Sequence, residues 1–261
     1  MKEKMISELA AELRGAESSG KSIEGLKLRY PEMTIQDAYQ IQLWNARLRA
    51  KSGEKLLGYK IGLTSIEARK HFGLETPDLG HLFEGMEWRE SEPFDLSRCH
   101  QPKIECEIAF KMAADLVGSQ CCDADVRAAV EWVAPAFEIV DSRIVDWKIK
   151  AEDTIADNGS SAYFIIGAKH WSIEGLDLAT LGMAMFRNSE VVTTAAGAAV
   201  MGDPIKAVTF LVKELANLDL GLKKGQIVLS GSLGGMSVMQ AGDVFEAEIY
   251  KLGKVSCRVS G

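Results

Sequence analysis

Two apolar runs that carry acidic side chains place the strongest constraint on how this chain folds. The runs read KIECEIAF and VAPAFEIVDSR, and both lie within residues 103–143. Alternate side chains of a β-strand share one face, so Glu105 and Glu107 project together while Cys106 points to the other side. Glu138 lies in the second run, with apolar residues before and after it. If the two runs are neighbouring strands, three carboxylates converge on one spot.

Converging carboxylates need a counter-charge, because buried anions repel one another and lose their hydration. A hard divalent cation with oxygen ligands, Mg²⁺ or Mn²⁺, supplies that charge. We therefore expect Glu105, Glu107 and Glu138 to bind a metal ion. An alternative stays open on spacing alone, since a Glu-x-Glu pair on a strand is most often a solvated sheet face.

The composition excludes several classes of protein. The net charge of −7 disfavours nucleic acid or an anionic membrane as the main partner. No apolar run approaches the ~18 residues that span a bilayer, and the N-terminus lacks the apolar core of a signal peptide. We expect a cytoplasmic protein. The five cysteines are odd in number and two are adjacent, so neither a disulfide framework nor a structural zinc site is indicated.

Hydrophobic periodicity and turn residues divide the chain into helices and strands. The strands do not alternate regularly with helices, which disfavours a doubly wound sheet or a TIM barrel. The pattern predicts an α+β fold with a mixed, rolled or sandwiched β-sheet and N-terminal helices. The expected helices are 2–17, 34–51, 64–72, 123–133 and 202–218. The expected strands are 55–63, 103–111, 135–142, 161–168, 226–231, 236–240, 243–250 and 254–259, with a hairpin over 181–197.

Local signals set several helix boundaries. Thr34 with Asp37, and Thr64 with Glu67, have the spacing of capping boxes, in which a side chain at each position bonds the other's backbone N–H. Asp123 is expected to cap the helix that follows it.

Three segments are expected to connect these elements. Residues 73–81 and 84–102 are rich in turn residues. Residues 146–161 form a polar segment that exceeds the usual length of a connection, which makes it a functional-loop candidate.

The order of several longer motifs resembles a known family. GYKIGLTS, TPDLGHLF, PKIECEIAF, PAFEIVDSRIVDWKIK, EDTIADN, AAGAAVMGDP and IVLSGSL follow one another along the chain. In this order they resemble the 2-oxopent-4-enoate (2-hydroxypentadienoate) hydratases of the fumarylacetoacetate hydrolase superfamily. The resemblance covers the chain from about Tyr30 to its end.

The resemblance implies a mixed, rolled sheet and a divalent metal held by acidic residues. The ligands it implies here are Glu105, Glu107 and Glu138, the same trio that the spacing indicates. We expect a single catalytic domain over residues 1–261, with a helical N-terminal part at 1–95 and a metal-binding β-roll at 96–261.

The implied activity is hydration of 2-hydroxypenta-2,4-dienoate to 4-hydroxy-2-oxopentanoate during the degradation of aromatic compounds. The similar 4-oxalocrotonate decarboxylases carry an apolar residue in place of Asp78 and a glycine in place of Ser232. Hydratases of 2-oxohept-3-enedioate carry extra residues after the DSR stretch, which is short here. Decarboxylation, the longer substrate and a non-catalytic partner subunit remain alternatives. The family also implies a homo-oligomer and complexes with enzymes of the same pathway.

Two residues are the candidates for the chemistry. Lys60, in an otherwise apolar strand, would hold the carboxylate or enolate oxygen of the substrate, although a surface lysine with a buried stem would show the same pattern. Asp78 would be the acid/base group, although an aspartate after Pro77 is also ordinary turn chemistry. His81 is expected to be structural.

Three further residues are expected to contact the substrate. Asp157 and Ser160 belong to the long polar segment, and Ser232 lies in the glycine-rich SGSLGG stretch. The alternative for each is a tight turn with no ligand.

Overall fold

A mixed β-sheet built on the two acidic runs forms the centre of the molecule. The computed structural model describes residues 1–261. β5 (Lys103–Met112) pairs antiparallel with β6 (Val130–Val140) along the whole of both strands. The sheet order is β2-β1-β10-β5-β6-β7-β3, and β11 also pairs with β5. The other strands are β1 (Leu56–Gly62), β2 (Asp78–Phe83), β3 (Glu87–Trp88), β7 (Ser161–Ile166), β10 (Ile227–Leu229) and β11 (Ser237–Val238).

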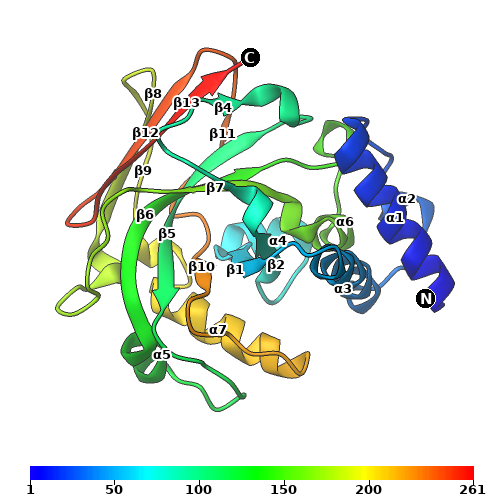
Figure 1. Cartoon of the computed structure of the whole chain (residues 1–261), viewed down its shortest axis with the longest axis horizontal. Helices are drawn as coiled ribbons and strands as arrows, with labels where there is room; N and C mark the ends of the chain where they lie inside the picture. The colour runs from blue at the N-terminus through cyan, green and yellow to red at the C-terminus, as the bar shows by residue number, and fades with distance from the viewer.

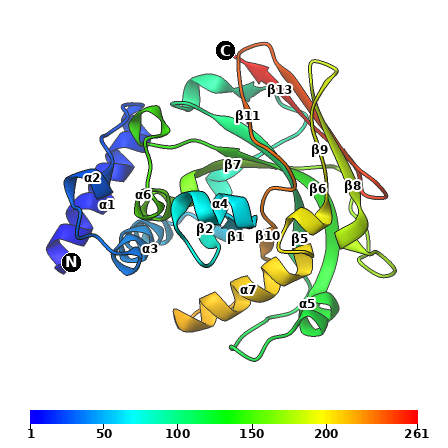
Figure 2. The same cartoon turned by 180° about the vertical axis from the view of Figure 1, so that it is seen from behind.

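A second sheet packs beside the first and has the order β4-β13-β12-β8-β9. Burial alternates along β12, where Phe245, Ala247 and Ile249 face the core and their neighbours face solvent. Figures 1 and 2 show this sheet next to the long, bent strands β5 and β6, at the end of the molecule opposite the N-terminal helices. Its strands are β4 (Phe94–Asp95), β8 (Gly182–Arg187), β9 (Glu190–Ala196), β12 (Val244–Ile249) and β13 (Gly253–Ser260).

The largest cluster of buried apolar side chains combines residues of both sheets with α7 (Pro204–Asn217). Asp203 caps this helix by accepting a hydrogen bond from the N–H of Ile205, and Pro204 occupies the first turn, where no N–H is needed. Cys106 belongs to the same cluster, as its position opposite the glutamates predicts. The α+β fold with a rolled sheet is therefore confirmed.

The N-terminal helices pack around a separate apolar cluster. The cluster joins α1 (Glu3–Ser19), α2 (Leu26–Arg29), α3 (Ile35–Lys51) and α6 (Ala151–Ala156), which lie together in Figure 1. The predicted capping box of α3, Thr34 with Asp37, is present.

The inner face of α3 includes a buried polar residue. Gln42 is buried and its amide donates to the carbonyls of Leu79 and Ile155, so a polar side chain ties this helix to β2 and α6. Trp44 is only half-buried against the N-terminal cluster.

Two other helix starts also differ from the prediction. Ser65, one residue after Thr64, caps α4 (Ile66–Phe72), because Thr64 is buried against Gly231. Cys122 rather than Asp123 is the N-cap of α5.

Pairing between distant strands accounts for most of the remaining differences. α5 (Asp123–Ala129) is shorter than predicted because the residues that follow it belong to β6. Part of the expected connection at 73–81 is β2, which pairs with β1. The expected connection at 84–102 contains β3 and β4, and the loop at 146–161 contains α6. Short 3₁₀ segments lie at Glu84–Met86, Leu96–Arg98, Val145–Trp147, Asn158–Ser160, Leu178–Thr180 and Gly197–Ala199.

β1 and β2 come from the first 95 residues, yet they lie in the same sheet as β5 and β6. The expected division of the chain at residues 95 and 96 stays a prediction. None of the helices is both long and apolar enough to cross a lipid bilayer.

Candidate metal centre and active site

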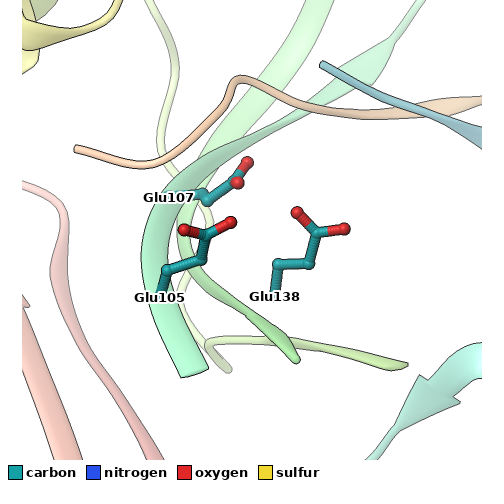
Figure 3. A group of neighbouring side chains, drawn as sticks. All are labelled: Glu105, Glu107 and Glu138. Carbon is teal, nitrogen blue, oxygen red and sulfur yellow. The ribbon is translucent and has the colours of Figure 1, made fainter. Parts of the chain in front are cut away.

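The three glutamates of the acidic runs meet on one face of the central sheet. Glu105 stands directly opposite Glu138 in the β5–β6 pairing, and Glu107 stands opposite Ala136. A carboxylate oxygen from each glutamate lies within 4.8 Å of the other two, and Figure 3 shows the three side chains converging. The predicted convergence is therefore confirmed.

Three carboxylate oxygens in this cluster accept no hydrogen bond. Glu107 and Glu138 are fully buried, yet Glu107 Oε1 and both Glu138 oxygens accept no hydrogen bond. Glu107 Oε2 accepts one from the N–H of Gly231, at 2.7 Å. Buried carboxylate oxygens without donors are costly, and a divalent cation with oxygen ligands would satisfy them. The donor set therefore fits a hard divalent metal.

Burial also shifts the proton equilibria of the cluster. Burial and then the neighbouring Glu138 raise the pKa of Glu105 to about 7. Burial, Glu138 and Glu105 raise the pKa of Glu107 well above its usual range. Both shifts have the sign expected for buried carboxyl groups close to other carboxyl groups, and the nearby Lys60 offsets them only in part.

One buried cation lies beside the cluster. Lys60, on β1, is 3% exposed, and its Nζ is 3.4 Å from Glu138 Oε2. Burial lowers the pKa of Lys60, but Glu138 and Asp78 outweigh burial and raise the pKa above its ordinary value. The side chain is therefore held as an ammonium group next to the carboxylates.

Asp78 begins β2 and stands opposite Gly62 of β1. Its carboxyl group is buried, and Oδ1 has no hydrogen-bond partner. A Cβ at position 62 would overlap Asp78 Oδ1, so glycine is required there. Burial raises the pKa of Asp78 and the nearby Lys60 lowers it, with a net rise.

A cavity of about 540 Å³ lies beside these groups, and Glu105 is the one glutamate of the cluster in its lining. It is lined by five of the eight residues that the sequence indicates, namely Lys60, Asp78, Glu105, Ser160 and Ser232. Apolar side chains form much of the remaining wall, among them Phe72, Trp147, Ile149, Leu233 and Met236. Such a pocket, apolar with a few convergent polar groups, is typical of a small-molecule site.

Comparison with known proteins places this arrangement in a family. The family model described as "Fumarylacetoacetate (FAA) hydrolase C-terminal" matches residues 84–260. The chain belongs to the fumarylacetoacetate hydrolase family. This finding confirms the resemblance seen in the motifs.

Relatives within the family share most of the chain. The chain is 44% identical to the 2-keto-4-pentenoate hydratase of Paraburkholderia xenovorans (strain LB400), over 95% of this chain and 92% of that protein. It is 42% identical to the 2-hydroxyhexa-2,4-dienoate hydratase of Comamonas testosteroni, over 91% of each protein. Among solved structures, the 4-oxalocrotonate decarboxylase from Pseudomonas putida G7, complexed with magnesium and adipate, superposes with a TM-score of 0.96. That pair is 35% identical and covers 99% of this chain and 98% of the other.

In this member of the family, both cavity serines are held by hydrogen bonds. Ser160 Oγ lies 3.1 Å from the hydroxyl of Thr154, which also lines the cavity. Ser232 Oγ donates to the carbonyl of Gly234, at 2.7 Å. The two hydroxyl groups are therefore fixed in the wall of the cavity.

Asp157 lies outside this cavity, contrary to the placement we expected. Its Oδ1 accepts a hydrogen bond from Arg143 Nε at 2.6 Å, and its Oδ2 accepts one from the backbone N–H of Arg143. The carboxylate therefore has an internal partner, and Asp157 is not among the residues that line the cavity. Arg143 was missed at the sequence level, because an arginine after a strand usually ends in solvent.

Unlike Arg143, Lys103 and Trp147 line the cavity, and neither was expected there from the sequence. Lys103 shares a strand face with Glu105, and its Nζ lies 4.0 Å from the centre of the Trp147 ring. The sequence could have indicated Lys103, because positions 103, 105 and 107 lie on the same face of a strand. The position of Trp147 has no comparable local signal.

His81 lies on the other face of β2, away from the cavity. It is 4% exposed, and its ring packs on Tyr59 with centroids 5.3 Å apart. Burial lowers the pKa of His81 to about 4. These features agree with the expected structural role.

Proposed function

We propose that this chain is a hydro-lyase that adds water to 2-hydroxypenta-2,4-dienoate, the enol of 2-oxopent-4-enoate, to give 4-hydroxy-2-oxopentanoate. One observation carries the proposal: a single cavity is lined by Glu105 of an acidic cluster that fits a divalent cation, by a buried ammonium group and by a buried carboxyl group with one oxygen free of hydrogen bonds. The 44% identity to 2-keto-4-pentenoate hydratases over nearly the whole chain supports it.

Glu105, Glu107 and Glu138 would hold the metal, Mg²⁺ or Mn²⁺, because oxygen-only ligand sets suit both ions. When bound, the ion supplies a Lewis acid that draws electron density toward the carboxylate and 2-oxo oxygens of the substrate. Solved structures of similar fold contain magnesium, calcium or manganese, and for the fumarylpyruvate hydrolase at 14% identity the likeness extends to the fold alone.

Lys60 binds the anionic end of the substrate. Its ammonium group is buried and stands beside the glutamate cluster, so an anion that reaches the metal also meets this charge. A charge-assisted hydrogen bond at a site with little water is strong, and it fixes the substrate in one orientation relative to Asp78.

Asp78 carries the protons. Burial raises the pKa of Asp78, which favours the protonated acid. In that state it gives a proton to carbon 5 while the 2-hydroxyl releases its own proton to solvent. The resulting carboxylate then accepts a proton from the water that adds at carbon 4. The electron pair released at carbon 3 takes up a proton from solvent. Asp78 is then protonated again, and the net change is addition of one water molecule. The hydroxyl groups of Ser160 and Ser232 contact the substrate from the cavity wall.

Decarboxylation of 4-oxalocrotonate is the second candidate, and one observation favours it. The backbone superposes on a 4-oxalocrotonate decarboxylase with a TM-score of 0.96. The same metal site and Lys60 would serve loss of carbon dioxide. Asp78 favours hydration, because decarboxylation requires no group that activates water.

Incubation of the purified enzyme and Mg²⁺ with 2-hydroxypenta-2,4-dienoate tests the proposal. We expect the diene absorbance to disappear and NMR to show 4-hydroxy-2-oxopentanoate. Persistence of the diene in the presence of Mg²⁺ or Mn²⁺ would overturn the assignment.

The same proposal includes a cytoplasmic homo-oligomer, which other enzymes of the pathway could bind. One chain supplies Lys60, Asp78 and Glu105 to the cavity lining, which disfavours a non-catalytic partner subunit. Sedimentation at micromolar concentration tests the oligomer, and a result with monomer only would remove that part of the proposal.

A further inference from the structure

A left-handed turn forms one wall of the active-site cavity. Asn158, Gly159 and Ser160 have consecutive φ values of +59°, +62° and +54°. Residues with a Cβ disfavour this conformation, and a run of left-handed residues is rarer still. Strained backbone of this kind persists only where its surroundings hold it, and it concentrates at functional sites.

Arg143 is the main support of this turn. Its Nη2 donates to the carbonyl of Asp157 at 2.6 Å, and its Nη1 donates to the carbonyls of Asp141 and Ser161. Its Nε and backbone N–H bind the Asp157 carboxylate. The Arg143 side chain is 6% exposed, so its donors are used within the protein, on both sides of the turn.

Asn158 attaches the turn to the edge strand β2. Its side-chain oxygen accepts a hydrogen bond from the N–H of His81 at 2.8 Å, and its side-chain nitrogen donates to the His81 carbonyl at 2.9 Å. The amide group thus pairs with β2 as another strand would. The turn has a fixed position relative to Asp78, which begins the same strand.

Gly159 brings the turn against the catalytic pair. A Cβ at this position would lie 2.8 Å from Lys60 Cε, 3.2 Å from Lys60 Nζ and 3.6 Å from Asp78 Oδ2. The backbone of Gly159 therefore closes one side of the space in which the Lys60 ammonium group can stand.

We propose that Arg143 and Asp157 are positioning residues that lock the left-handed turn 158–160, and that this turn fixes Lys60 beside Glu138 and Asp78. The proposal rests on the proposed function for its catalytic consequence. The placement of Lys60 by this turn does not depend on which reaction the enzyme performs.

Gly159→Ala tests the contact directly, with Gly20→Ala as its control. Gly20 has a φ of +67°, close to that of Gly159, but a Cβ there would meet nothing within 4 Å. An alanine at either position must adopt a similar left-handed backbone conformation. At position 159 the flexible Lys60 side chain can move away from the added Cβ atom. We expect Gly159→Ala to lose more melting temperature than Gly20→Ala, because it also separates the buried Lys60–Glu138 pair. Only Gly159→Ala should lower kcat, by at least about tenfold.

Arg143→Lys tests the support of the turn, with Arg187→Lys as its control. Arg187 pairs with Asp243, and the Asp243 carboxylate also accepts a hydrogen bond from Asn188 in a left-handed hairpin turn of the second sheet. Each substitution keeps the charge and removes the fork of donors. We expect both variants to melt at lower temperature, but only Arg143→Lys should lower kcat.

Crystal structures of the metal-free glycine variants give a readout that does not depend on turnover. In Gly159→Ala we expect the distance from Lys60 Nζ to Glu138 Oε2 to increase from 3.4 Å to beyond about 4 Å, the usual limit of an ion pair. In Gly20→Ala it should stay as in the parent. Lys60 unmoved in Gly159→Ala, together with parental kcat, would overturn the proposal. If the parent itself does not hydrate the dienoate, the proposed function fails, and the Lys60 distance still decides the positioning proposal.

Discussion

Lys60 neutralises part of the acidic cluster, and its replacement by methionine has a cost that follows from the structure. Lys60 Nζ and Glu138 Oε2 are 3.4 Å apart, and the two side chains are 3% and 0% exposed. At an effective dielectric constant of about 20, two unit charges at this distance interact by roughly 5 kcal/mol. Removing one partner of a buried pair costs about 3–5 kcal/mol. We expect metal-free Lys60→Met to lose this amount of unfolding free energy.

Thermal unfolding monitored by circular dichroism measures the effect. For a chain of this size each kcal/mol corresponds to about 2–4 °C, so the melting temperature in EDTA should fall by about 10 °C. Mg²⁺ at 100 times its Kd stabilises a folded protein by about 2.7 kcal/mol. The variant should gain at least this much, because the ion replaces the missing positive charge.

Lys148→Met is the matched control. Lys148 and Asp146 are 2.9 Å apart but are 73% and 65% exposed, and exposed pairs contribute about 0–1 kcal/mol. A metal-free Lys60→Met protein that melts as close to the parent as Lys148→Met does would refute the reasoning that Lys60 balances the cluster.

Three further predictions concern the metal, the proton transfers and the pH dependence of stability. Glu138→Gln should weaken metal binding measured by calorimetry, because the site loses a charged ligand; unchanged affinity would contradict the ligand set. Asp78→Asn should bind metal like the parent while turnover falls by ~10²–10⁴, and a parental rate would mean that Asp78 is only the start of a strand. Burial lowers the pKa of His81 to about 4. Between about pH 6.5 and pH 4, this histidine therefore binds a proton in the unfolded chain but not in the folded protein. This histidine should therefore remove about 3 kcal/mol of stability as the pH falls through that range. Urea unfolding at pH 7 and pH 5 should show a smaller pH dependence in His81→Phe, and an equal dependence in both proteins would exclude this origin.

The period-two pattern of the acidic runs was enough to predict the shared face of Glu105 and Glu107. The position of Glu138 opposite Glu105 depends on the register between β5 and β6. The apolar residues around Glu138 indicated a buried strand, but they could not determine that register. Lys60 and Asp78 reach the cluster through β10, which pairs with β1 on one side and β5 on the other. That arrangement joins segments far apart in the sequence, so local patterns could not predict it. The family resemblance, rather than a local pattern, favoured Lys60 and Asp78 as site residues.

Arg143 and Asp157 show where local reasoning fails. The stretch Asp-Asn-Gly has the composition of an exposed turn, and Asp157 was placed with the substrate. Its carboxylate instead binds Arg143, fourteen positions earlier in the chain. Gly and Pro around Asp78 likewise indicated a loop, whereas pairing with β1 makes this segment a strand. In both cases contacts between distant segments override the local preference.

The choice between hydration and decarboxylation is the central claim, and one competition experiment tests it most directly. The enzyme and Mg²⁺ receive equal amounts of 2-hydroxypenta-2,4-dienoate and of 4-oxalocrotonate that carries ¹³C at the carboxyl group lost on decarboxylation. NMR then follows 4-hydroxy-2-oxopentanoate and labelled carbon dioxide or bicarbonate in the same tube. We predict rapid formation of the hydroxy acid with the label retained in 4-oxalocrotonate. Release of the label while the dienoate accumulates would contradict the account.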